Sequence, residues 1–257
     1  MLKTRVLPCL LLQGTGLVKT VQFRNPVYIG DPINTVRIFN TKQVDELVLL
    51  DISATKENRK PQVDLIGKIA EECLMPLTVG GGIRSLDDIR ELFNAGVEKV
   101  VINSYAVTNP LFVKKAANQF GSQAIVISID VRRHHDGSWG VFTKGGSFPT
   151  GIDPADLAVQ MESVGAGEIL LTSIDYDGTM RGYDIEVIKY VSDAVSIPII
   201  ACGGAGSLED FERAVKEGGA CAVAAGSFFV FHGRRKAVLI NFPTKSELEA
   251  VLNGGVT

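Results

Sequence analysis

Three carboxylates stand at the ends of apolar runs, where a parallel β-strand would finish. Asp51 and Asp130 each end such a run, and Asp177 lies just beyond a third. A carboxylate held at the end of a strand can act as a general acid or base, or it can cap the turn that follows. The apolar strand leading to Asp130 favours catalysis there. Asp177-Gly178 is also a turn signal, so both interpretations of Asp177 stay open.

Two glycine clusters could hold anions, and their sequences are Gly80-Gly81-Gly82 and Gly203-Gly204-Ala205-Gly206. Glycine lets the backbone approach an anion closely, and the helix that follows points free N–H groups at it. The next apolar runs end in Asn103-Ser104 and Gly226-Ser227. These patterns predict two phosphate sites and a ligand with a phosphate at each end, although the glycines could simply allow tight turns. Lys19 could reach a phosphate or stay solvated.

Four charged residues mark the opposite ends of predicted strands. Arg5, Glu46, Lys99 and Glu168 each begin one. Two positive and two negative side chains could form a ring across the bottom of a barrel, where inward-pointing charges must pair. Such a ring, with Glu98 beside it, would be a gate or a partner surface. The alternative is four unrelated solvated side chains.

The elements that must position these residues recur at a steady interval. Continuous apolar runs of this kind are typical of parallel strands covered on both faces, and helical periodicity lies between them. Eight such units predict a single (β/α)8 barrel over residues 1–257, with a doubly wound sheet as the alternative. The predicted strands are Arg5–Leu11, Glu46–Asp51, Leu77–Gly80, Lys99–Asn103, Ala124–Asp130, Glu168–Thr172, Pro198–Cys202 and Cys221–Ala225.

An internal repeat supports the barrel. Asp31-Pro32 returns as Asp153-Pro154, and the second glycine cluster returns 122 residues after the first. A fixed offset over so many positions indicates a duplicated half. We therefore expect half-barrels over about 1–122 and 123–257.

Several classes of function are disfavoured by composition. The net charge is −3 with dispersed basic residues, so neither nucleic acid nor a membrane surface is an expected partner. The run from Val6 to Leu12 is too short for a signal peptide or a membrane span. The four cysteines lack CxxC spacing, which favours buried reduced thiols in a cytoplasmic protein.

The long segment from Arg132 to Thr150 contains the only tryptophan, Trp139. It predicts a mobile hairpin loop over the mouth of the barrel. Its adjacent histidines, His134-His135, would point apart and lack a third ligand, so no metal site is predicted. The sequence predicts no cofactor.

Long motifs resemble the cyclase subunit, HisF, of imidazole glycerol phosphate synthase. They are the sequences Arg5-Val6-Leu7-Pro8-Cys9-Leu10, Val79-Gly80-Gly81-Gly82-Ile83, Asp177-Gly178-Thr179 and Ile200-Ala201-Cys202-Gly203-Gly204-Ala205-Gly206. The resemblance implies a barrel that receives ammonia from a glutaminase docked at its bottom and uses it on a bisphosphate at its top.

The resemblance also implies roles for individual residues. It assigns Asp130 as one of two catalytic aspartates, Lys19 as a lysine of the first loop, and the four-charge ring as the ammonia gate. The implied phosphate and substrate residues are Gly82, Asn103, Ser104, Asp177, Gly203, Gly204, Gly226 and Ser227.

Two departures redirect the expected function. Leu11 occupies the position of the family's other catalytic aspartate, and the sequence after Phe231 differs from that of the histidine-pathway enzyme. Both features resemble a HisF branch that supplies ammonia to a separate sugar amidotransferase in surface-polysaccharide synthesis. We therefore expect glycosyl amidation. The alternatives are a true cyclase and a non-catalytic ammonia conduit; a sugar-phosphate isomerase is disfavoured by Leu11 and has no use for the ring.

Overall fold

The computed structural model describes residues 4–233 and 237–252, and within them eight parallel strands form a closed barrel. Pairing of the last strand with the first closes the sheet. In chain order the barrel strands are β1 (Arg5–Gln13), β4 (Leu47–Asp51), β5 (Leu77–Gly80), β6 (Lys99–Ile102), β7 (Ile125–Arg133), β10 (Glu168–Ser173), β11 (Ile199–Cys202) and β12 (Ala222–Ala225). The predicted (β/α)8 barrel is confirmed, with strand bounds within a few residues of those expected.

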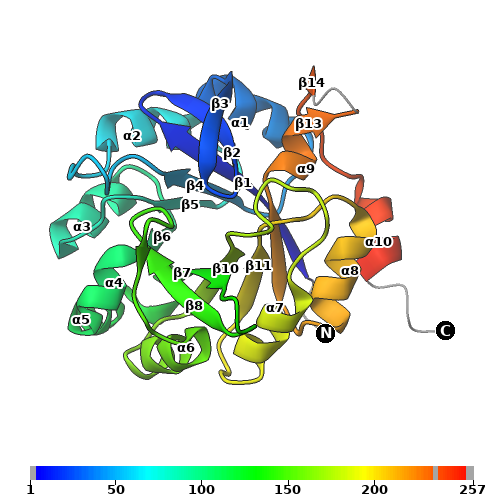
Figure 1. The fold of residues 1–257 in the computed structure, drawn as a ribbon. Helices are drawn as coiled ribbons and strands as arrows, with labels where there is room; N and C mark the ends of the chain where they lie inside the picture. Colours follow the sequence, from blue (N-terminus) through cyan, green and yellow to red (C-terminus); the bar gives the residue numbers. More distant parts are fainter. Residues whose placement is uncertain (1–3, 234–236, 253–257) are drawn as a thin grey trace.

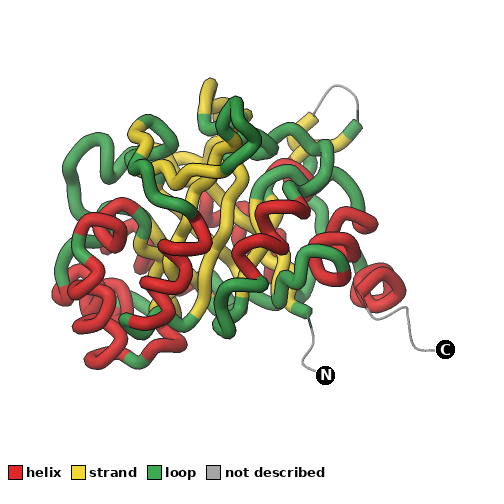
Figure 2. The backbone as a smooth tube through the Cα atoms, turned by 60° about the horizontal axis from the view of Figure 1, so that its bottom comes forward, coloured by secondary structure: helices red, strands yellow, loops and turns green. Residues whose placement is uncertain are grey.

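Helices surround the barrel and fill the space between strand and solvent (Figure 1). Figure 2 shows the strands between flanking helices, with loops and hairpins crowded above one end. The helices are α1 (Pro32–Thr41), α2 (Val63–Glu72), α3 (Leu86–Asn94), α5 (Pro110–Phe120), α6 (Pro154–Ser163), α7 (Ile185–Ser192), α8 (Leu208–Lys216) and α10 (Lys245–Leu252), with short α4 (Ser104–Thr108), α9 (Ser227–Val230) and the 3-10 turn η1 (Ser122–Ala124).

The barrel separates two apolar cores. Successive strand residues point to opposite faces of the sheet. On β1, Leu7 belongs to the cluster inside the barrel and Val6 to the cluster beneath the helices. On β6, Val101 and Val100 divide in the same way. Both faces of each strand are thus buried, which explains why the strands read as continuous apolar runs.

The sequence repeat returns as repeated helix caps. Asp31 and Asp153 each cap a helix that begins with proline; the side chain of Asp31 accepts one backbone N–H of the first turn, and that of Asp153 accepts two. Asp88 Oδ2 accepts hydrogen bonds from the backbone N–H groups of Arg84 and Ser85. At the same offset of 122, Asp210 Oδ2 accepts those of Gly206 and Ser207. The duplicated sequence therefore repeats local geometry. The expected bounds of the half-barrels stay a prediction.

Three antiparallel hairpins follow barrel strands in the chain: β2 (Gly16–Val21) with β3 (Arg24–Gly30) after β1, β8 (Trp139–Thr143) with β9 (Phe148–Pro149) after β7, and, beyond α9, β13 (Phe231–His232) with β14 (Ala237–Val238). The second confirms the hairpin expected after Arg132, whereas its mobility stays a prediction. The first was not recognised in the sequence. Within the third, residues 234–236 lie outside the described residues.

The expectation that the cysteines are buried holds for only two of them. Cys9 and Cys202 are buried and free, but Cys73 is half-buried and Cys221 is exposed. Cys221 directly precedes β12, where the chain is still at the surface, so the expectation that it would be buried was wrong. Among the described residues, no helix combines the length and apolar character needed to cross a membrane.

Removing the second repeated cap should destabilise the fold. Asp210→Ala loses the acceptor of two backbone N–H groups, so we expect the free energy of unfolding to fall by about 2 kcal/mol. Urea denaturation measures this. Glu212→Ala, which removes only an exposed ion pair with Lys216 on the same helix, is the control and should change stability by less than about 0.5 kcal/mol. Equal effects of the two variants would contradict the assignment.

Candidate functional site

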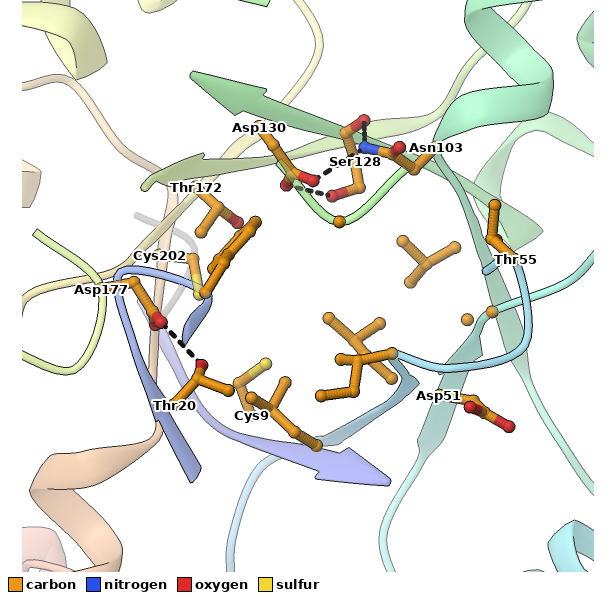
Figure 3. A pocket seen from close by; sticks show the side chains of 18 of the residues that line it. Cys9, Thr20, Asp51, Thr55, Asn103, Ser128, Asp130, Thr172, Asp177 and Cys202 are labelled. Carbon is orange, nitrogen blue, oxygen red and sulfur yellow. Dashed lines mark hydrogen bonds between the residues drawn. The ribbon is translucent and has the colours of Figure 1, made fainter. Parts of the chain in front are cut away.

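A cavity of about 300 Å³ opens at the carboxyl ends of the barrel strands. Its lining is largely apolar, and polar side chains that include Asn103, Asp130 and Asp177 stand around its wall (Figure 3). Catalytic sites of (β/α)8 barrels lie at this end. The lining includes every residue predicted to be catalytic or to bind phosphate: Lys19, Gly82, Asn103, Ser104, Asp130, Asp177, Gly203, Gly204, Gly226 and Ser227.

Asp130 is a buried carboxyl on the apolar strand β7. It accepts hydrogen bonds from Ser128 Oγ at 3.2 Å and Asn103 Nδ2 at 3.1 Å. Burial raises the pKa of Asp130 to about 7, and the nearby Asp177 carboxylate adds to the rise. A group with this pKa can both hold and release a proton near neutral pH, as a general acid or base requires.

Lys19 is almost fully buried, so the structure does not show it as a solvated lysine. Its Nζ donates to the carbonyl oxygen of Cys9 at 2.5 Å, and burial lowers its pKa. The amine lies directly over Gly226, where any side chain would collide with it. The absence of a Cβ at position 226 therefore makes room for Lys19.

Asp177 joins the first hairpin to the loop after β10. Its carboxylate accepts from Thr20 Oγ1 at 3.0 Å, and its carbonyl oxygen accepts from the N–H of Gln22. Burial raises the pKa of Asp177, opposed by the positive charge of Lys19. This carboxylate thus holds the hairpin over the cavity as well as facing its interior.

Asp51 points away from the centre of the cavity (Figure 3). Arg59 forms an ion pair with it at 2.7 Å, and backbone N–H groups of Ser53 and Ala54 donate to it. Burial alone would raise its pKa, but these donors outweigh burial and lower it. Asp51 therefore organises the loop after β4, as a capping aspartate does.

The first predicted anion site lies beneath the second hairpin. Gly82 has a φ of +77°, and a side chain there would meet the backbone of Arg59. Ser104 begins α4, donates to Asn103 Oδ1 at 2.9 Å and accepts the backbone N–H of Lys144 at 3.0 Å. Close packing thus explains in part why position 82 is a glycine. The hydroxyl group of Ser104 and the amide groups that contact it lie together beside this position.

The second predicted anion site lies across the cavity. Gly203 and Gly204 both have positive φ and follow β11, and Ser227 begins α9 after β12. In the closed strand order β11 and β12 are four places from β5 and β6, so the two sites face each other. This arrangement fits a ligand with an anionic group at each end.

Two hairpin tips meet above the cavity. A Cβ placed on Gly146 would lie 3.0 Å from the ring of Phe23, so the tip of the first hairpin lies against that of the second. Phe23 itself has a φ of +61°. Trp139 stacks on Tyr190 and donates to Asp184 at the base of the second hairpin.

The four charges at the strand starts lie together at the opposite end of the barrel. Arg5 contacts Glu46 and Glu168 at 2.5 Å each, and Lys99 contacts the same two carboxylates at 3.2 and 3.0 Å. Positive and negative side chains therefore alternate around one ring. Burial alone would lower the pKa of Arg5, but both carboxylates raise it. Glu98 is exposed beside the ring.

Some residues at these sites were missed from sequence. Thr78 donates to Glu46 at 2.7 Å and thereby supports the ring. Ser128 lies two residues before Asp130 on the same strand face, so strand periodicity could have identified it. Lys144 could not have been identified, because the hairpin brings it to Ser104 from far along the sequence.

Comparison with known proteins gives consistent matches over nearly the whole chain. A family model described as "Histidine biosynthesis protein" matches residues 5–235. A Pseudomonas aeruginosa protein named "Putative imidazole glycerol phosphate synthase subunit hisF2" is 47% identical over 97% of this chain and 99% of its own length. Proteins of Leptospira borgpetersenii and Leptospira interrogans, both named "Putative imidazole glycerol phosphate synthase subunit HisF", are 47% and 46% identical over 98% of this chain and 99% of their own lengths.

Burial of Asp130 predicts a pH-dependent stability. In the unfolded chain this carboxyl ionises near pH 4, whereas in the folded protein it ionises near pH 7. Between these values the folded state binds the extra proton, so the free energy of unfolding falls as pH rises, by up to about 4 kcal/mol. Asp130→Asn has no carboxyl group to ionise, so this fall in the free energy of unfolding should be absent. The difference in free energy of unfolding between this variant and wild type, measured by urea denaturation, should therefore grow in favour of the variant from pH 5 to pH 8. Asp64→Asn, at an exposed position, is the control, and a gain independent of pH would contradict the prediction.

Proposed function

The chain belongs to the HisF family of histidine biosynthesis proteins, and from this premise we propose that it is an ammonia-channelling subunit of a glutamine amidotransferase system. A glutaminase partner docks at the bottom of the barrel and supplies ammonia. The ammonia crosses the interior and leaves through the upper cavity. It serves amidation of a sugar in surface-polysaccharide synthesis.

The alternating charged ring is the observation that carries the proposal. It lies at the end of the barrel opposite the cavity, where it has no role in chemistry at the cavity. Ion pairs can close the floor against water and still rearrange, unlike a packed apolar plug. In this proposal Arg5, Glu46, Lys99 and Glu168 form the gate.

The interior between ring and cavity supports passage of neutral ammonia. Its side chains form one apolar cluster that includes Leu7, Val101 and Leu170, with Ala222 and Ala224 as its smallest members. An ammonium ion would lose its hydration there at a cost of many kcal/mol. Neutral ammonia lacks this penalty, so an apolar interior selects the nucleophilic form.

Leu11 argues for amidation over cyclisation. It lines the cavity but cannot move a proton, which leaves Asp130 without the paired aspartate of the family pattern. Asp130 and Lys19 keep positions suited to proton transfer and to an anionic ligand. The two facing sites, with Gly82, Asn103 and Ser104 on one side and Gly204, Gly226 and Ser227 on the other, would retain the capacity to bind phosphate.

A true cyclase is the second candidate, because the names of the relatives and the buried Asp130 both favour it. That enzyme would convert the histidine-pathway bisphosphate to imidazole glycerol phosphate. A non-catalytic conduit is the third, since an intact ring with an incomplete aspartate pair is what such a protein would have.

Cyclisation by the wild-type protein should be weak with ammonium salt as the nitrogen source. Loss of one proton-transferring group costs about two to four powers of ten in rate. Leu11→Asp should recover some of this rate, measured as imidazole glycerol phosphate formed from the bisphosphate. Leu11→Asn, which is polar but not basic, is the matched control and should recover none. Wild-type turnover as fast as that of an authentic cyclase would overturn the preference for amidation.

Opening the ring should uncouple glutamine hydrolysis from amidation of the acceptor. Lys99→Ala removes one of the two cations that bridge Glu46 and Glu168 and leaves only Arg5 between them, so the floor should close less tightly. In a reconstituted system of glutaminase, this chain and the amidating enzyme, we expect less amidated product per glutamine hydrolysed.

The control for this experiment is Lys189→Ala, which removes an exposed lysine of α7 that pairs with Asp193 and not with the ring. Thermal unfolding of Lys99→Ala separates a local opening from loss of the fold. A product-to-glutamine ratio equal to that of wild type would exclude a gating role for the ring.

A further inference from the structure

We propose that Cys9 and Cys202 form a binding site for one soft, two-coordinate metal cation of the copper(I) class at the floor of the upper cavity. The proposal rests on the placement of two thiols and does not depend on the proposed function. Both cysteines are free, and both line the cavity.

The two sulfur atoms face the same space. Cys9 and Cys202 belong to the cluster inside the barrel and are 4% and 8% exposed. Figure 3 shows both side chains directed into the cavity from neighbouring regions of its wall. The neighbouring Cys202 thiol, together with Lys19, lowers the pKa of the Cys9 thiol. The pair therefore lies where a small ion entering from the cavity can reach both sulfurs.

A disulfide does not fit this pair. Cys9 is on β1 and Cys202 on β11, and β12 lies between these strands. Two strand spacings separate the backbones by roughly 9 Å. A disulfide needs Cα atoms within about 7 Å and sulfurs about 2 Å apart. The strands would have to move to form the bond, so oxidation is not the chemistry that the geometry favours.

A bridging cation fits where a disulfide does not. Metal–thiolate bonds are about 2.3 Å long, so a cation between two sulfurs spans roughly twice that distance. Soft thiolates select copper(I), whereas zinc requires about four ligands. The residues described by the structure contain no group of three or more histidine, cysteine or acidic side chains suited to a metal. A two-coordinate soft cation is therefore the ion class that matches the available ligands.

The charge balance is also favourable. One copper(I) ion displaces a proton from each thiol, and the resulting bis-thiolate carries one negative charge without any change in oxidation state. The amine of Lys19, held at the carbonyl oxygen of Cys9, supplies a nearby positive charge when protonated. An occupied site would fill the floor where the barrel interior meets the cavity.

Competition with the copper(I)–bicinchoninate complex tests the site, under anaerobic conditions with ascorbate. The starting protein carries Cys73→Ser and Cys221→Ser, which removes the two thiols outside the site. We expect it to withdraw one copper per chain, seen as loss of the bicinchoninate colour. Adding Cys9→Ser or Cys202→Ser should weaken binding by about a hundredfold or more, because one thiol cannot complete the coordination.

Trp139 fluorescence and urea denaturation establish that each variant remains folded. If Cys9→Ser does not fold, Cys202→Ala provides another variant that lacks one of the two thiols. Failure of the starting protein to withdraw copper would overturn the proposal. So would binding of equal strength after loss of either thiol. Intact mass measurement of the air-oxidised starting protein gives a second check, since formation of a Cys9–Cys202 disulfide without unfolding would contradict the strand geometry.

Discussion

Hydrogen bonding between β12 and β1 closes the sheet, and the rest of the structure depends on that closure. A closed barrel has an inside, so every second strand residue belongs to a confined interior with two ends. The strand starts bring four charges to one end, and the strand ends bring carboxyl and hydroxyl groups to the other. The apolar side chains between them keep the ends chemically separate.

Confinement also explains why similar carboxyl groups behave differently. Asp51 and Asp130 both lie near the carboxyl ends of barrel strands, but Arg59 and backbone N–H groups stabilise the charge of Asp51. Asp130 has only neutral donors and is buried near a second carboxylate, so its pKa is raised to about 7. The identity of the residue is the same in both cases, and the neighbours decide whether it anchors a loop or can exchange a proton.

Much of this arrangement could be predicted because it follows from local periodicity and from the repeat. Apolar runs located the strands, the constant offset indicated duplication, and the charges at the strand starts pointed to the ring. The burial of Lys19 could not be predicted, since it depends on a hairpin folding back over Gly226. The exposure of Cys221 and the contact between Lys144 and Ser104 likewise depend on where loops end in space.

The contact between Phe23 and Gly146 has a mechanical consequence for the mouth of the barrel. These residues are far apart in the sequence, and each hairpin is also tied to its own surroundings through Asp177 and Ser104. Neither hairpin tip can move away from the mouth without losing its contact with the other. The positions of the two tips are consequently coupled, and a substitution in either tip alters a contact on which both depend.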